Sequence, residues 1–240
     1  DRFYIPVTHI DLIQKYTGGS AGTTPKLDRL GGATWARTKA RVKKALRDIT
    51  DELVKLYSRW LDHQGTYETY RQALVGFYLK NLKGCSKEKI MEASRIVVPF
   101  YKNRTYIFAN QLIDKLRRDG YHIIAVSGSP FEVVEEFNKY LKFDAVFGTV
   151  YEVDDEGIYT GNTLFEPTSD KGQVVRQYMA EHNLILDGSY GVGDTESDAS
   201  FLEIVDNPIA FNPNFNLKKI AEKKKWKIVV EKKDVIYEIN

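Results

Sequence analysis

The sequence has little cysteine, no long apolar run and almost no net charge. Its single cysteine, Cys85, excludes a framework of disulfides within the 240 residues and is typical of a reducing compartment. No apolar stretch approaches the ~20 residues that a membrane-spanning helix needs, and no signal peptide opens the sequence. The formal net charge of +2 gives no global electrostatic reason to expect nucleic acid binding. These absences predict a cytoplasmic chain without membrane contact.

The patterning of apolar residues changes near Trp60. Residues 1–33 predict a short strand from Arg2 to Val7 and a turn-rich segment, and a long helix follows from an N-cap at Thr34. The first half of that helix is rich in Lys and Arg, which favours either a partner surface or an exposed basic face. Residues 66–118 keep helical spacing and predict a helical bundle.

From Gly120 onwards, strand and helix patterns alternate. Apolar stretches predict strands at 121–126, 145–150 and 208–211, with a hairpin around 154–157. Helices are expected at 131–141, from Lys171 and at 199–205. Strands that are buried on both faces and alternate with helices indicate a parallel sheet with right-handed crossovers. We therefore expect an α/β fold with a Rossmann-like parallel sheet.

The most informative segment is the acidic turn GVGDTESD at 191–198. It places Asp194 and Asp198 four residues apart at the opening of a helix, after a weak apolar run at 184–186. Such a carboxylate pair can hold Mg²⁺ beside a phosphate, because Mg²⁺ prefers a few hard oxygen ligands together with water and substrate oxygens. The alternative is an acidic helix N-terminus, which the helix dipole and capping also favour.

Two further polar residues precede this turn along the chain. Ser127 follows a predicted strand and begins a helix, so its hydroxyl and the adjacent amides, including that of Gly128, can receive phosphate oxygens. Lys171 lies at a helix start, where a cation is unfavourable unless an anion is near. Taken singly, these residues are also typical of an N-cap and of a solvated lysine. Because ligands of open parallel sheets bind beyond the carboxyl ends of the strands, their order predicts a phosphate site with a metal ligand.

Residues 66–240 resemble the haloacid dehalogenase superfamily, in its phosphoserine-phosphatase-like branch. The resemblance rests on the motifs IIAVSGSP, SDKGQVV and GVGDTESD, and also on IAFNPN and WKIVV. It implies a small phosphorylated substrate and Mg²⁺, with a helical cap beside the Rossmann-like sheet. The implied site residues have the following roles: phosphate binding by Ser127, Gly128 and Lys171, charge neutralisation in catalysis by Lys171, and organisation of the metal by Asp194 and Asp198, the latter supporting catalysis.

The superfamily's first motif, a strand that ends in D-x-D, does not occur in this sequence. In the superfamily its first aspartate attacks phosphorus and its second is the general acid/base. Asp11 has no second carboxylate two residues on, and Asp62 precedes His63 rather than another acid. The resemblance thus implies a phosphomonoester hydrolase that is impaired or inactive. The motif also supplies the central strand, whose place we expect Phe3–Val7 to fill, although Pro6 is unfavourable in a central strand.

Residues 1–60 resemble a different family, the bacterial transcription-repair coupling factor, through FYIPV, LIQKY, PKLDRLGG and a W…A…K pattern. The resemblance implies the end of an RNA-polymerase-interacting domain and the long helix that follows. The alternative function is therefore an RNA-polymerase-binding module acting through residues 1–33. We predict three segments, 1–60, a cap at 61–106 and an α/β core at 107–240, with a natural or engineered fusion near Trp60. A third interpretation is a chimaera without function.

Overall fold

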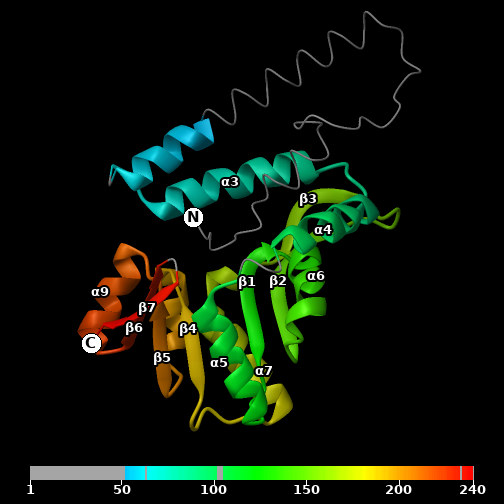
Figure 1. The fold of residues 1–240 in the computed structure, drawn as a ribbon. Coiled ribbons are helices and arrows are strands. Elements are labelled where there is room, and N and C mark those ends of the chain that lie inside the picture. Colours follow the sequence, from blue (N-terminus) through cyan, green and yellow to red (C-terminus); the bar gives the residue numbers. More distant parts are fainter. Residues whose placement is uncertain (1–51, 63, 102–104, 233, 240) are drawn as a thin grey trace, which may run out of the picture. The chain divides into compact units, whose positions relative to one another are not determined.

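The computed structural model describes residues 52–62, 64–101, 105–232 and 234–239 (Figure 1). These residues fall into two compact units. The core unit comprises Ser94–Tyr151 and Thr163–Asn240, and the helical unit comprises the described residues up to Ala93 together with Glu152–Asn162. The predicted strand at 2–7, the start of the long helix at Thr34 and the expected role of Phe3–Val7 all lie outside the described residues. The limits predicted for the cap and the core stay predictions.

The helical unit is built around helix α3 (Tyr67–Leu82). The side chain of Thr66 caps this helix by accepting the amide of Thr69 at 3.1 Å. Helix α4 (Lys87–Tyr101) begins in this unit and runs on into the core unit. Pro99 lies inside this helix, two residues before its last residue. None of the described helices is long and apolar enough to cross a membrane.

Four aromatic rings join α3 to the helical residues that precede it. Trp60 lies with its ring centroid 5.1 Å from that of Tyr67, and Tyr57 lies 5.4 Å from Tyr70. Such tilted ring pairs add stabilisation beyond the area they bury. Burial raises the pKa of the Tyr70 hydroxyl, with a further contribution from Tyr57. The cluster therefore closes a helical hairpin at the point where the apolar pattern of the sequence changes.

The described strands form two sheets, and the α/β prediction is confirmed. The first has the order β1-β2-β3, and the second has the order β4-β5-β6-β7. Neighbouring strands are parallel from β1 to β2 and from β4 through β6, whereas β7 is antiparallel to β6. The bounds are β1 (Ile124–Pro130), β2 (Ala145–Val153), β3 (Tyr159–Phe165), β4 (Tyr190–Gly193), β5 (Asn207–Phe211), β6 (Lys227–Lys232) and β7 (Val235–Ile239).

Strand β1 differs from the expected strand at 121–126. It begins at Ile124, and its regular ladder to β2 ends at Val126, after which the register shifts before Pro130. Ser127 therefore lies in a bulge of the strand and does not begin a helix. Helix α6 (Phe131–Leu141) starts four residues later, over the range that apolar periodicity predicted. A bulge re-aims the backbone at the end of a strand, and side-chain periodicity does not reveal it.

Strand β4 is not formed by the apolar run at 184–186. It consists of Tyr190–Gly193, and Ile185 is 77% exposed. Two of its four residues are glycines, so the strand has little side-chain signal to detect. Helix α8 (Ala199–Leu202) is also shorter than the helix expected at 199–205.

Strands β5 and β6 are buried on both faces. One face packs against Tyr106 and against two residues of helix α5 (Ile107–Arg118), namely Phe108 and Leu112. The other face packs against α8 and helix α9 (Phe215–Lys224) (Figure 1). The residues of these two clusters are Ile209, Phe211 and Val229 on the α5 side, and Leu202, Ala210, Leu217, Ala221 and Ile228 on the α9 side. This burial explains the continuous apolar character of these strands.

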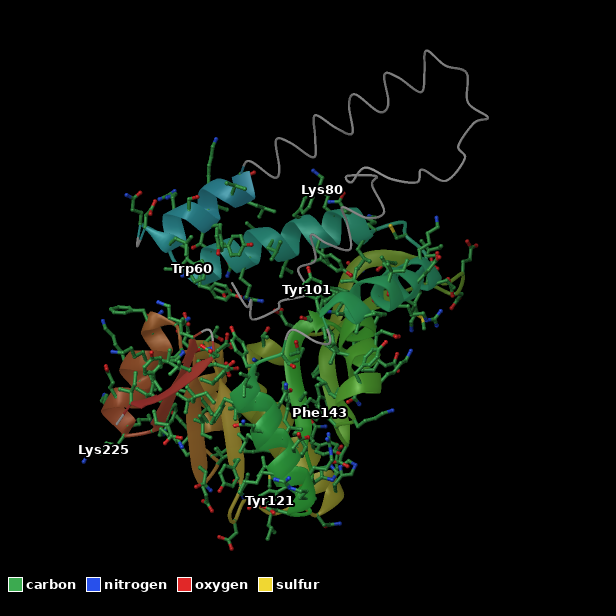
Figure 2. All side chains as sticks on the ribbon, viewed as in Figure 1. Trp60, Lys80, Tyr101, Tyr121, Phe143 and Lys225 are labelled. Carbon is green, nitrogen blue, oxygen red and sulfur yellow. The ribbon has the colours of Figure 1, made fainter. Side chains whose placement is uncertain are left out.

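Within the described residues, β1 pairs only with β2 and β4 only with β5. The two sheets meet instead where these strands begin. The hydroxyl of Tyr121, which Figure 2 labels, donates to the carbonyl of Gly188 at 3.2 Å, and its ring lies 5.8 Å from that of Tyr190. Val192 of β4 remains 39% exposed. These contacts link the starts of β1 and β4 in the described part of the chain.

The buried carboxylate of Glu231 on β6 caps helix α5. Its two oxygens accept the amides of Ile107 at 3.0 Å and Phe108 at 2.8 Å. These amides are among the first four of the helix, which have no partner within it. A carboxylate at a helix N-terminus is also favoured by the helix dipole.

We expect Glu231→Gln to lower the free energy of unfolding by about 1–3 kcal/mol, because an amide nitrogen cannot accept the second of these hydrogen bonds. The matched control is Glu238→Gln on β7, whose carboxylate is exposed and pairs with Lys227. That control should change the unfolding free energy by less than about 1 kcal/mol. Equal effects in denaturant unfolding would contradict the proposed cap.

Candidate functional site

A buried ion pair joins Lys171 to Asp198. Lys171 is the first residue of helix α7 (Lys171–His182), and Asp170 caps that helix by accepting the amide of Gln173 at 2.9 Å. The amine of Lys171 donates to Oδ1 of Asp198 at 2.5 Å, with the two side chains 11% and 3% exposed. A cation at a helix start is unfavourable by itself, and Asp198 supplies the anion that offsets it.

The second oxygen of Asp198 holds the acidic turn. Asp198 ends the short 3-10 helix η2 (Glu196–Asp198), and its Oδ2 accepts the amides of Asp194 at 2.8 Å and Thr195 at 3.0 Å, which precede this helix. A Cβ atom at Gly193 would lie 2.4 Å from the Cβ of Asp198, so a glycine is required for this close approach. Asp198 therefore connects Lys171 to the backbone of Asp194.

Helix α7 reaches Asp198 because of Gly172 and Ser200. A Cβ atom at Gly172 would lie 2.5 Å from the carbonyl oxygen of Ser200, and the amide of Gly172 donates to the Ser200 hydroxyl at 3.0 Å. The sequence motifs predicted neither residue as part of the site. A glycine directly after a lysine at a helix start was the available signal, because glycine is unfavourable in helices without a packing reason.

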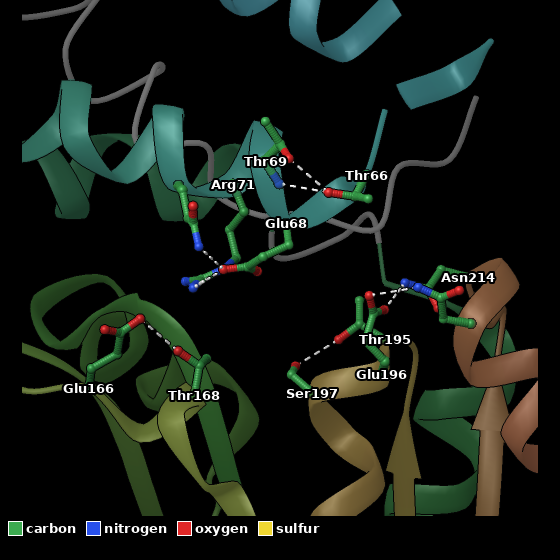
Figure 3. A network of polar contacts seen from close by, with 12 residues as sticks. Thr66, Glu68, Thr69, Arg71, Glu166, Thr168, Thr195, Glu196, Ser197 and Asn214 are labelled. Carbon is green, nitrogen blue, oxygen red and sulfur yellow. Dashed lines mark hydrogen bonds and ion pairs between the residues drawn. The ribbon is translucent and has the colours of Figure 1, made fainter. Parts of the chain in front are cut away.

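Ser127 and Gly128 lie at the bulge of β1. The Ser127 hydroxyl accepts the amide of Ser129 at 3.1 Å, and the Gly128 carbonyl accepts the hydroxyl of Thr149 at 2.9 Å. A Cβ atom at Gly128 would lie 2.8 Å from Cγ2 of Thr168. Thr168 belongs to the 3-10 helix η1 (Pro167–Ser169), two residues before α7, and its hydroxyl donates to Glu166 at 2.9 Å (Figure 3).

The structure thus connects the predicted site residues in two ways. Lys171, Asp198 and the Asp194 backbone are joined by direct hydrogen bonds. The Ser127–Gly128 bulge contacts η1, which leads into Lys171. All of these residues belong to the core unit.

The donor set for a metal is small. Asp198 already directs one oxygen to Lys171 and the other to two amides. No group of three His, Cys, Asp or Glu residues that could hold a metal ion occurs in the described part of the chain. Asp194 therefore remains as the candidate carboxylate ligand. This set fits Mg²⁺ only when a phosphate and water supply the other oxygens.

Part of the chain is similar to the transcription-repair-coupling factors. It is 50% identical over 58 residues to the protein from Bacillus subtilis strain 168, and 46% identical over 57 residues to that from Staphylococcus aureus strain USA300. Each match covers 24% of this chain. The chain spans about 5% of the length of these curated relatives.

Solved structures are similar over most of the chain. A protein of unknown function from Bordetella pertussis Tohama I has a TM-score of 0.62 and 21% identity, covering 92% of this chain and 89% of that one. A substrate-bound phosphoserine phosphatase complex has a TM-score of 0.53 and 20% identity, covering 94% and 87%. A phospho-aspartyl intermediate analogue of phosphoserine phosphatase has a TM-score of 0.51 and 22% identity, covering 79% and 85%. These likenesses show the fold.

The family model of the haloacid dehalogenase-like hydrolases matches residues 25–203. This match begins earlier in the chain than the resemblance described above, which starts at residue 66. Because it spans more than half of the 240 residues, the chain belongs to the haloacid dehalogenase-like hydrolase family.

Proposed function

We propose that the chain binds a small phosphomonoester where β1 and β4 end, and that its hydrolytic turnover is greatly reduced or absent. The observation that carries this proposal is the buried Lys171–Asp198 pair, whose carboxylate also holds the Asp194 turn. A nearly buried ammonium group at the N-terminus of α7 is a ready site for an anion. The carboxyl ends of parallel strands are the usual binding edge of such sheets.

Each site residue has a role in this proposal. The Ser127 hydroxyl and the Gly128 amide hold phosphate oxygens, and Lys171 neutralises their charge. Asp198 keeps the Lys171 amine in place and fixes the turn that carries Asp194. Asp194 would hold Mg²⁺ together with phosphate oxygens and water. When bound, Mg²⁺ supplies further neutralisation of phosphate charge.

The reduced turnover is inferred from the missing D-x-D motif. Without it the chain lacks the family's nucleophile and proton donor together. Residues that act as one catalytic unit fail together, so the loss of this pair costs several orders of magnitude in rate. Binding uses Ser127, Gly128 and Lys171 and does not depend on that motif.

The direct test measures Mg²⁺-dependent hydrolysis of p-nitrophenyl phosphate by the wild type, Lys171→Ala and Asp194→Asn. We expect no turnover above the variants, together with weak binding of inorganic phosphate that Lys171→Ala removes. Turnover that both variants abolish would show that another carboxylate replaces the nucleophile, and the predicted impairment would be wrong. The absence of any phosphate binding by the wild type would contradict the binding site itself.

The ion pair should also stabilise the core unit. We expect Lys171→Met to lower the free energy of unfolding by about 3–5 kcal/mol, because Asp198 would be left buried without its cation. Lys218→Met is the matched control, since Lys218 pairs with Glu222 at the same 2.5 Å but on the surface. We expect a change of about 1 kcal/mol or less in that variant. Similar losses in both variants, measured by denaturant unfolding, would contradict the stabilising role of burial.

The close approach at Gly193 gives a further prediction. Gly193→Ala should lower the free energy of unfolding by about 1–3 kcal/mol through overpacking against Asp198, and it should remove phosphate binding. Gly76→Ala in α3 is the control, because nothing lies within 4 Å of the Cβ atom it would add. We expect that change to stabilise its helix by about 0.5–1 kcal/mol. Phosphate binding that survives Gly193→Ala would count against the proposed turn geometry.

A second candidate function is contact with RNA polymerase through residues 1–33. The 50% identity over 58 residues to a transcription-repair-coupling factor favours it. Residues 1–33 lie outside the described part of the chain, so the proposal depends on sequence similarity. A pull-down of the polymerase β subunit by the whole chain tests it. We expect retention, whereas no binding at micromolar concentration would contradict this candidate.

A further inference from the structure

We propose that Asn214 is a positioning residue that fixes the Asp194 turn from the side opposite to Asp198. The inference rests on the proposed phosphate site, because Asp194 is its candidate metal ligand. Asn214 lies at the N-terminus of α9 and touches neither Lys171 nor the β1 bulge through any hydrogen bond found among the described residues. Its effect on the site must therefore pass through the turn.

Asn214 contacts the turn through its backbone and its side chain. Its amide donates to the carbonyl of Asp194 at 2.8 Å. Its side-chain Nδ2 donates to Oε2 of Glu196, two residues further along the turn (Figure 3). Since Asp198 holds the amides of Asp194 and Thr195, the turn is fastened on both of its sides.

The side-chain amide of Asn214 can point in only one direction. Its Oδ1 accepts the amide of Leu217 at 2.9 Å and so caps α9. Because Oδ1 accepts this amide, the NH₂ group faces Glu196. Asn216 donates to the other oxygen of that carboxylate at 3.0 Å. The charge of Glu196 is thereby directed to the N-terminus of α9, where the helix dipole favours it.

The segment that presents Asn214 is itself anchored to β6. Asn212 has a φ of 44°, in the left-handed region that asparagine tolerates. Its Oδ1 accepts the amide of Glu231 at 2.9 Å, and its own amide donates to the carbonyl of Val229 at 2.8 Å. Val229 is fully buried in the core. The position of Asn214 is therefore set by β6, and Asn214 in turn holds the Asp194 turn in place.

The test compares Asn214→Asp, Asn214→Ser and Asn216→Ala in the whole chain. Aspartate and serine both keep an oxygen that can cap α9, but neither has the amide donor. Aspartate also places a second carboxylate against Glu196, and the two negative charges repel each other. Asn216→Ala removes one donor to Glu196 and leaves every contact of Asn214 in place.

The main readout is the protection factor of the Asp194 and Thr195 amides against hydrogen exchange. For Asn214→Asp we expect a loss of about tenfold, because the donor is lost and two carboxylates then face each other. Asn214→Ser should lose about threefold, and Asn216→Ala less than about twofold. The Leu217 amide should stay protected in all three variants.

Unchanged protection of Thr195 in Asn214→Asp, or a loss no larger than that in Asn216→Ala, would overturn the proposal. Lost protection of the Leu217 amide would show that Asn214→Asp unfolds α9. In that case Asn214→Ser is the test of the proposal, and full protection of Thr195 in Asn214→Ser would overturn the proposal. A second readout is the affinity for inorganic phosphate with Mg²⁺. Wild-type chain that binds no phosphate would contradict the proposed function, while the protection factors would still decide the role of Asn214. Phosphate binding lost in Lys171→Ala but unchanged in Asn214→Asp would overturn the positioning role alone.

Discussion

The ion pair between Lys171 and Asp198 is buried, and burial of two charges is costly unless their remaining hydrogen-bonding capacity is also met. Here the second carboxylate oxygen meets two backbone amides of the acidic turn. One carboxylate thereby connects helix α7, the end of β4 and the turn that carries Asp194. The glycine at 193 permits this contact by leaving the space beside Asp198 open. The Asp194 turn takes its position from this pair.

The core unit carries the proposed binding edge, whereas the sequence contains no D-x-D motif. Ser127 and Gly128 lie at the β1 bulge and Asp194 follows β4, and these are the residues that we propose for phosphate and metal. In the described residues no ladder joins β1 to β4, and the contacts of Tyr121 with Gly188 and Tyr190 link the starts of the two strands. We therefore propose that binding and chemistry are separable in this chain, and we expect phosphate binding without turnover.

The sequence indicates the surroundings of Lys171 better than it indicates the strands nearby. Apolar periodicity predicts α6 over its observed range, and the odd placement of Lys171 at a helix start correctly indicates a nearby anion. Apolar periodicity does not predict the place of Ser127, because a bulge leaves no periodic signal. It also does not predict β4, because half of that strand is glycine. The role of Asn214 depends on a contact with residues about twenty positions away, and local patterns do not encode such contacts.

We propose that Lys171 and the Ser127–Gly128 bulge form one phosphate site although the nucleophile motif is missing. A crystal structure of the whole chain, grown with inorganic phosphate and Mg²⁺, would decide this. We expect a phosphate within hydrogen-bonding distance of both the Lys171 amine and the Gly128 amide, with Asp198 still holding the Asp194 turn. Phosphate bound elsewhere, or Lys171 paired with Asp198 and no phosphate beside it at saturating concentration, would show that these residues do not form a phosphate site.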